Sequence, residues 1–242
     1  GIALLLTAFV SAWALIPHKD MRALHADAIV AGDWKSLADD QVAGMIDQQR
    51  EQFEKSMKSS GTVRRAVKKM ETVGRMLAVL GNVEVQRQKG DGAKKAAALR
   101  DAALALADAA KAKNFEDASK ADEKIKSYPD KISPADSAEP MPWDKLIDMD
   151  YIMNGVSIAD AETKKALAGK DAEFKKLCRD AERHALMLAV LGNVTHEMQT
   201  DDDWRGWCKD MHAQSIALAG AFKKKDQAGA TTARETLYKT CE

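Results

Sequence analysis

Proline, aromatic residues, cysteine and net charge are all scarce in this sequence, and each shortage narrows what the chain can be. Glycine and proline number only 14 and 5, and aromatic residues make up 5% of the 242 residues, which argues against a β-sandwich or a barrel. The three cysteines include no Cys-x-x-Cys pair. Lysine plus arginine equal aspartate plus glutamate at 37 each, so no basic excess is available to hold a nucleic acid or a membrane surface.

The residues that are abundant favour long helices. Apolar residues make up 45% of the chain and charged residues 31%. Alanine, lysine and glutamate dominate the middle of the sequence and are good helix formers. We therefore predict an all-α fold, and the length suits two domains of roughly 100 residues each.

The first residues have the pattern of an export signal. Residues 1–17 are almost entirely apolar, and Ala12-Trp13-Ala14 offers the small residues that a signal peptidase reads. We interpret residues 1–14 as the remnant of a signal peptide, residues 15–33 as an N-terminal helical lead, and the protein as periplasmic or secreted. If uncleaved, the segment would be a membrane anchor, since about 17 apolar residues can just span a bilayer. The sequence starts without an initiator methionine or a basic region, so we expect residues to be missing upstream.

An internal repeat organises the rest of the chain. The block Met-Leu-Ala-Val-Leu-Gly-Asn-Val at 76–83 recurs letter for letter at 187–194, which is 111 residues later. Trp34 is answered by Trp143 at a spacing of 109, and the segment from Leu104 is answered from Ile216 at a spacing of 112. The sequence is therefore one unit written twice, with small length changes where loops are expected.

Each copy is predicted to be an antiparallel four-helix bundle. Residues 128–142 hold four of the five prolines and are predicted to be the linker between copy 1, at 34–127, and copy 2, at 143–242, which we expect to be truncated at its C-terminal end. Turn and cap residues predict helices at about 34–59, 62–88, 93–113 and 115–127 in copy 1. In copy 2 they predict a helix from 143 interrupted near Asn154-Gly155 and restarted with Ser157 as its N-cap, then helices near 171–198, 201–225 and 226–242. The fold class is thus two tandem antiparallel four-helix bundles.

Apolar residues three or four apart support these helices. Copy 1 has such a stripe from Val63 to Leu80, and copy 2 repeats it from Phe174 to Leu191. Gly81 and Gly192 lie inside the two helices, although glycine costs about 1 kcal/mol there relative to alanine. They predict the close approach of a neighbouring helix or of a flat ligand.

Histidine and cysteine are the residue types that could carry chemistry. His184 lies on the apolar stripe where copy 1 has Val73, so it either lines a pocket or is a core histidine with a backbone partner. No histidine pair has a metal-binding spacing, and no metal site is predicted. Cys178 is interpreted as a small buried apolar residue. If the chain turns near Asp226, a Cys208–Cys241 disulfide is allowed in an oxidising compartment.

Motifs of catalysis are missing. There is no glycine-rich phosphate loop, no Gly-x-Ser-x-Gly and no pair of carboxylates that can be placed across a cleft. Trp204 and Trp207 open a helix after three aspartates, and we expect them to close the end of a core. We predict that the chain is not an enzyme.

The C-terminal residues resemble a family. The runs Ala217-Leu-Ala-Gly-Ala221, Lys225-Asp226, the alanine-rich 228–233 and Leu237-Tyr-Lys-Thr-Cys-Glu242 look like the approach to Cys-x-x-Cys-His in exported four-helix cytochromes of the c-prime type and related planctomycete-type c-type cytochromes. The motif is incomplete, because the chain ends one residue after Cys241. The resemblance implies that Cys241 forms the first thioether bond to heme c and that the axial histidine lies beyond Glu242. Copy 1 has Pro129 at the matching position and would be heme-free.

Two functions from different classes follow. By resemblance, the second bundle binds heme for electron transfer or gas binding, with a redox protein as partner. The alternative is a heme-free helical scaffold or protein-interaction module held by the Cys208–Cys241 disulfide.

Overall fold

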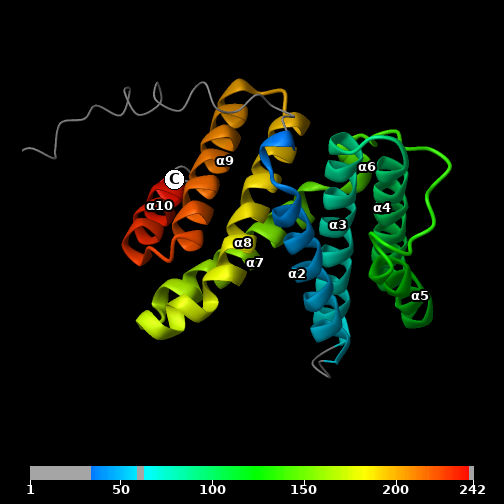
Figure 1. The fold of residues 1–242 in the computed structure, drawn as a ribbon, viewed down its shortest axis with the longest axis horizontal. Helices are drawn as coiled ribbons and strands as arrows, with labels where there is room; N and C mark the ends of the chain where they lie inside the picture. The colour runs from blue at the N-terminus through cyan, green and yellow to red at the C-terminus, as the bar shows by residue number, and fades with distance from the viewer. Residues whose placement is uncertain (1–33, 59–62, 240–242) are drawn as a thin grey trace, which may run out of the picture. The chain divides into compact units, whose positions relative to one another are not determined.

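The computed structural model describes residues 34–58 and 63–239 (Figure 1), and throughout these residues the regular structure is helical, without a strand. This confirms the all-α prediction. The first copy forms η1 (Trp34–Ser36), α2 (Asp39–Lys58), α3 (Val63–Arg87), α4 (Gly90–Lys111) and α5 (Phe115–Lys126). The second copy forms α6 (Trp143–Leu146), α7 (Met149–Ala168), α8 (Asp171–Met198), α9 (Asp202–Lys223) and α10 (Gln227–Lys239).

The predicted interruption of the first long helix of copy 2 is wrong. Helix α7 runs unbroken through Gly155 and begins after Asp148, whose carboxylate accepts a hydrogen bond from the backbone N–H of Tyr151 at 3.2 Å. Ser157 is no cap, because its hydroxyl donates to the carbonyl of Met153 within the helix at 2.8 Å. The cap signal at Asp148 therefore outranks the breaking tendency of the glycine.

Within each half, consecutive helices pack side by side. Helix α3 lies along α4 and α8 lies along α9, while α2 and α5, and likewise α7 and α10, cover these pairs from outside. Among the described residues, no helix is long and apolar enough to cross a membrane. The predicted signal segment at 1–14 and the lead at 15–33 lie outside the described residues.

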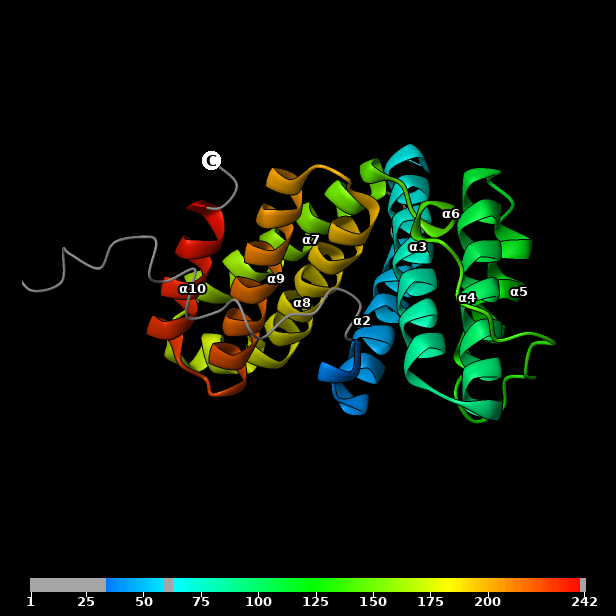
Figure 2. The same ribbon diagram turned by 90° about the horizontal axis from the view of Figure 1, so that it is seen from above.

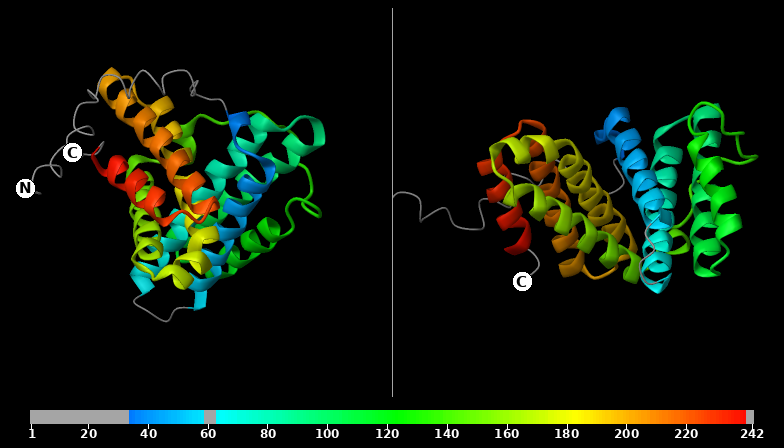
Figure 3. Two further views of the ribbon diagram at one scale, coloured as in Figure 1. Left: turned by 60° about the vertical axis from the view of Figure 1, so that its left-hand side comes forward. Right: turned by 90° about the horizontal axis from the view of Figure 1, so that it is seen from below.

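The two halves contact each other reciprocally. Helix α2 of the first half packs on α8 of the second, and the matching helix α7 packs on α3 (Figures 2 and 3). The short helices follow the same rule, with η1 on α3 and α6 on α8. Trp34 and Trp143, which are matched residues of the repeat, also meet each other with ring centroids 5.3 Å apart. This is the contact pattern of a twofold interface, in which each side presents the same patch to the other.

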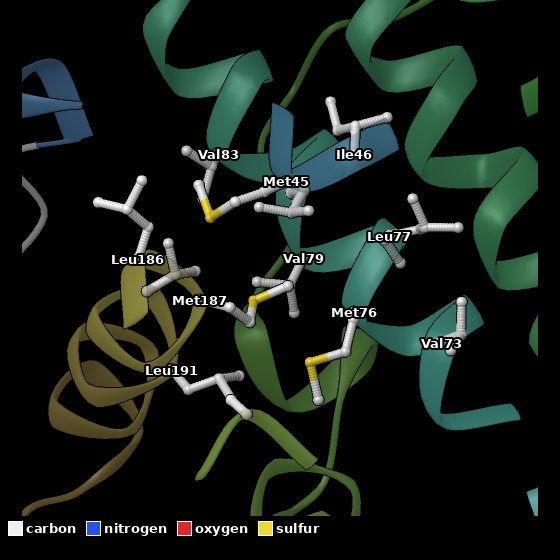
Figure 4. Packing of buried hydrophobic residues seen from close by; sticks show 14 of the residues in the cluster. Met45, Ile46, Val73, Met76, Leu77, Val79, Val83, Leu186, Met187 and Leu191 are labelled. Carbon is white, nitrogen blue, oxygen red and sulfur yellow. The ribbon is translucent and has the colours of Figure 1, made fainter. Parts of the chain in front are cut away.

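One hydrophobic core runs through both halves. The buried apolar residues of both copies form a single cluster, and residues 31–242 form one compact unit. At the junction, Met76 of α3 and Leu191 of α8 both press against Gly155 of α7. Figure 4 shows Leu186, Met187 and Leu191 of α8 facing Met45, Val79 and Met76 of the first half. The prediction of two separate bundles is therefore not confirmed.

The repeated block explains why the core is shared. Residues 76–83 are all buried, and so are residues 187–194. A helix that meets solvent on one side buries only a stripe, whereas a helix buried on every side lies in an interior. Each block therefore needs a cover beyond its own half, and the other half supplies it.

The predicted linker is fixed to the first half. We call residues 128–142 the strap; Figure 1 shows it in green, passing from α5 to α6 beside α4. The side-chain amide of Asn82 donates to the carbonyl of Met141 at 3.0 Å and accepts from the N–H of the same residue at 2.9 Å. Arg100 donates to the carbonyl of Glu139 at 2.7 Å. The strap thus closes the outer face of α3 and α4 through its main chain.

Candidate functional site

His184 lies inside the second half, on α8. It is buried and makes no hydrogen bond with the described residues, so the backbone partner considered in the sequence is not found. Burial lowers the pKa of its imidazole to about 4, although the carboxylates of Glu162 and Asp180 oppose this change. The imidazole is therefore neutral at pH 7.

The structure does not bring His184 close to the end of α10. Arg234 of α10 pairs with Asp160 of α7 at 2.7 Å, and the α7 neighbours of His184 lie one turn further along that helix. His184 is therefore level with the first part of α10, and about eight residues of rise, roughly 12 Å, separate that level from Lys239. Cys241 lies outside the described residues.

The two described cysteines are free thiols in the interior. Cys178 belongs to the core cluster, as predicted, and burial raises its thiol pKa. Cys208 is also buried, with a raised pKa from the same cause. The proposed partner of Cys208 in a disulfide, Cys241, lies outside the described residues, so this pairing stays a prediction.

The two repeated glycines mark close helix contacts, as the sequence predicts. A Cβ on Gly81 would lie 2.7 Å from the backbone nitrogen of Arg100 on α4. A Cβ on Gly192 would lie 3.1 Å from the carbonyl oxygen of Cys208 and 3.2 Å from the backbone nitrogen of His212 on α9. Arg100 and His212 are 112 residues apart, so the structure pairs the repeats in the same register as the sequence does.

A group of polar side chains in the second half has no internal partners. We call Asn193, His196, Arg205 and Lys209 the α8/α9 face. Asn193 is 3% exposed and His196 is 2% exposed. Asn193 makes no hydrogen bond with the described residues, and both ring nitrogens of His196 and the Nε of Arg205 are buried without a partner. Such groups cost about 1–3 kcal/mol each when nothing satisfies them, so the face is suited to a ligand with hydrogen-bond acceptors.

Electrostatics gives this face a positive character. Burial lowers the pKa of His196, and the nearby charges of Arg205 and Lys209 lower it further. Neither Arg205 nor Lys209 forms an ion pair with a described residue. Sequence reasoning did not select any of these four residues. The signal that could have found them is the difference between the repeats, because copy 1 has Val85, Ala93 and Ala97 where copy 2 has His196, Arg205 and Lys209.

The tryptophans of α9 do not close a core. Trp204 is 45% exposed and Trp207 48% exposed, and their rings pack edge to face with centroids 5.6 Å apart. The expectation that they lie inside the end of the bundle is therefore wrong. No group of three or more histidine, cysteine, aspartate or glutamate side chains that could hold a metal ion occurs in the part of the chain that the structure describes.

The buried state of His184 predicts sensitivity to acid. Its pKa in the folded chain, about 4, is below the ordinary 6.5, so the unfolded chain takes up a proton first as the pH falls. The stability that His184 contributes is complete above pH 6.5, and about 3 kcal/mol should be lost as the pH falls towards 4. Replacing it with the residue of copy 1, His184→Val, should flatten this loss in urea titrations over the same pH range. Parallel curves for the two proteins would contradict the prediction.

No family model, curated protein or solved structure matches this chain. The likeness of residues 217–242 to c-type cytochromes therefore stays a prediction.

Proposed function

We propose that this chain is a heme-free helical protein-interaction module of an exported protein, with the first half as its scaffold and the second half as the part that binds. The observation that carries the proposal is the α8/α9 face. The first half satisfies its matching positions internally, through Asn82 and the strap, while the second half leaves Asn193 and His196 buried without partners. Buried polar groups are nearly always hydrogen-bonded in folded proteins, and exceptions call for an explanation such as a missing ligand.

The exposed tryptophan pair supports the same proposal. Trp204 and Trp207 lie on α9, the helix that also carries Arg205 and Lys209. Tryptophan and arginine are the side chains most enriched where protein partners bind tightly. The matching residues of copy 1 are Gly92 and Lys95, so the aromatic pair is again a property of the second half alone.

Heme binding by the second half is the second candidate. It is favoured by the sequence leading to Cys241 and by the neutral imidazole of His184, because a metal binds the unprotonated ring. In this proposal Cys241 holds heme c by a thioether bond, and the protein transfers electrons to a redox partner or binds a gas. The separation of His184 from the end of α10 argues against His184 as the axial ligand of a heme held there.

A pyridine hemochrome spectrum of the protein purified from its natural host decides between the two candidates. For the interaction module we expect no covalent heme. A c-type spectrum that disappears in the Cys241→Ala variant would instead establish heme attachment and overturn the heme-free proposal. Cys178→Ala is the matched control, since it removes a cysteine that is buried in the core.

A further inference from the structure

We infer that the α8/α9 face binds an extended peptide segment of a partner protein, with a carboxylate side chain, in the way the strap lies on α3 and α4. This inference rests on the proposed interaction function and names its binding surface and the chemistry of its partner.

The first half supplies the template. Asn82 both donates to and accepts from the main chain of one residue, Met141. An amide that does this recognises a peptide backbone whatever the side chain is. A second main-chain contact joins the N–H of Ala135 to the carbonyl of Lys94 at 3.1 Å. The strap is therefore a peptide bound to a helix pair by its backbone.

The second half keeps the reading residue without the peptide. Asn193 matches Asn82 in the repeated block, and the contacts of Gly81 and Gly192 place the two helix pairs in the same register. Asn193 makes no hydrogen bond with the described residues. The same amide is thus available in the second half to pair with the N–H and the carbonyl of one peptide residue.

The side chains around Asn193 define what the peptide carries. In the first half, Ala135 of the strap packs against Val85, Ala96 and Ala97. At the positions of Val85 and Ala97 the second half has His196 and Lys209, and Arg205 stands for Ala93. An apolar contact has been replaced by hydrogen-bond donors and positive charges. The complementary group on the peptide is therefore a carboxylate at the position of Ala135.

A peptide fits these observations better than a small anion does. A free anion could accept hydrogen bonds from His196 and Arg205, but it has no N–H group for the Asn193 oxygen. A peptide with an acidic side chain satisfies both sets of groups at once.

The strap itself provides the probe. We would label the peptide Ile-Ser-Pro-Ala-Asp-Ser-Ala-Glu-Pro-Met-Pro, which is residues 132–142, and a second peptide with the substitution Ala135→Asp. Binding to the full chain is measured by fluorescence anisotropy. We expect one site per chain and an affinity for the acidic peptide about tenfold higher than for the original, as one charge-assisted contact would give. Raising the salt concentration should remove most of this difference.

Three variants locate the site. Asn193→Ala should weaken both peptides by about tenfold, because it removes two hydrogen bonds, and it should unfold like the original protein, because Asn193 makes no hydrogen bond within the fold. The double variant Arg205→Gln with Lys209→Gln should abolish the preference for the acidic peptide. Lys176→Gln, which removes an exposed charge of α8 far from the face, is the control and should change neither affinity.

The outcomes are distinct. If neither peptide binds, or if Asn193→Ala leaves both affinities unchanged, the inference is overturned. If inorganic phosphate binds the face and peptides do not, the face is a small-anion site and the inference is again overturned. In either case a chain without covalent heme keeps the proposed interaction function, whereas a c-type hemochrome spectrum removes that function whatever the peptides do.

Discussion

Met76→Asp is expected to unfold both halves of the protein together. Met76 is buried in the junction, where it presses on Gly155 of α7 and lies close to Leu191 of α8. An aspartate there would bury a charge without a partner and lose the apolar contact, at a cost of about 4 kcal/mol or more. Domains of this kind have only about 5–15 kcal/mol in total. Because one core is shared, the damage cannot stay in the first half.

Urea titrations followed by the helical circular dichroism signal test this expectation. The variant should show one transition of full amplitude at a much lower midpoint than the original protein. Lys69→Asp puts the same carboxylate on an exposed position of the same helix and should cost less than about 0.5 kcal/mol. If half of the helical signal kept its original midpoint in Met76→Asp, the halves would be independent bundles, as first predicted from the sequence.

Gly81→Ala is expected to be the most damaging single-methyl change in the chain. Its new Cβ would lie 2.7–2.9 Å from backbone and Cβ atoms of Arg100, and a helix backbone cannot move aside as a flexible side chain can. Overpacking of this kind costs about 1–3 kcal/mol and at times more, against a gain of about 1 kcal/mol in helix propensity. We expect a net loss of about 2 kcal/mol in the free energy of unfolding.

Gly192→Ala is the matched control for this prediction. The same methyl group on α8 would meet α9 at 3.1–3.5 Å, which requires only a small shift. We expect a change within about 1 kcal/mol of the original protein. Equal losses in the two variants, measured by chemical denaturation, would show that the helix pairs α3/α4 and α8/α9 are packed equally closely, contrary to the structure.

Helix positions were largely readable from the sequence because they depend on local signals. The predicted helix at 171–198 has the same bounds as α8, and Asn114 caps α5 by accepting from the N–H of Asp117, as its position suggested. The break near Gly155 was wrong because a single glycine was weighed above the aspartate cap at Asp148. Local rules therefore failed only where two of them competed.

The shared core and the candidate site depend on contacts between distant residues. The uninterrupted apolar block 76–83 was read as evidence of duplication, although its lack of any polar side also indicated burial between two partners. His184 was selected as an unusual polar residue on an apolar stripe, but the structure places it away from the end of α10. Asn193 and His196 were not selected, since only the strap on Asn82 shows what the matching residue in copy 2 could bind.

The reciprocal contact between the halves has a consequence for how such a protein can change. In a pair of identical separate chains, every substitution appears on both sides of the symmetry axis. Here the two sides are encoded separately, so histidine, arginine and lysine could replace valine and alanine on one side while the strap kept the other side closed. Each molecule therefore carries a single copy of the altered surface, and its assembly does not depend on protein concentration.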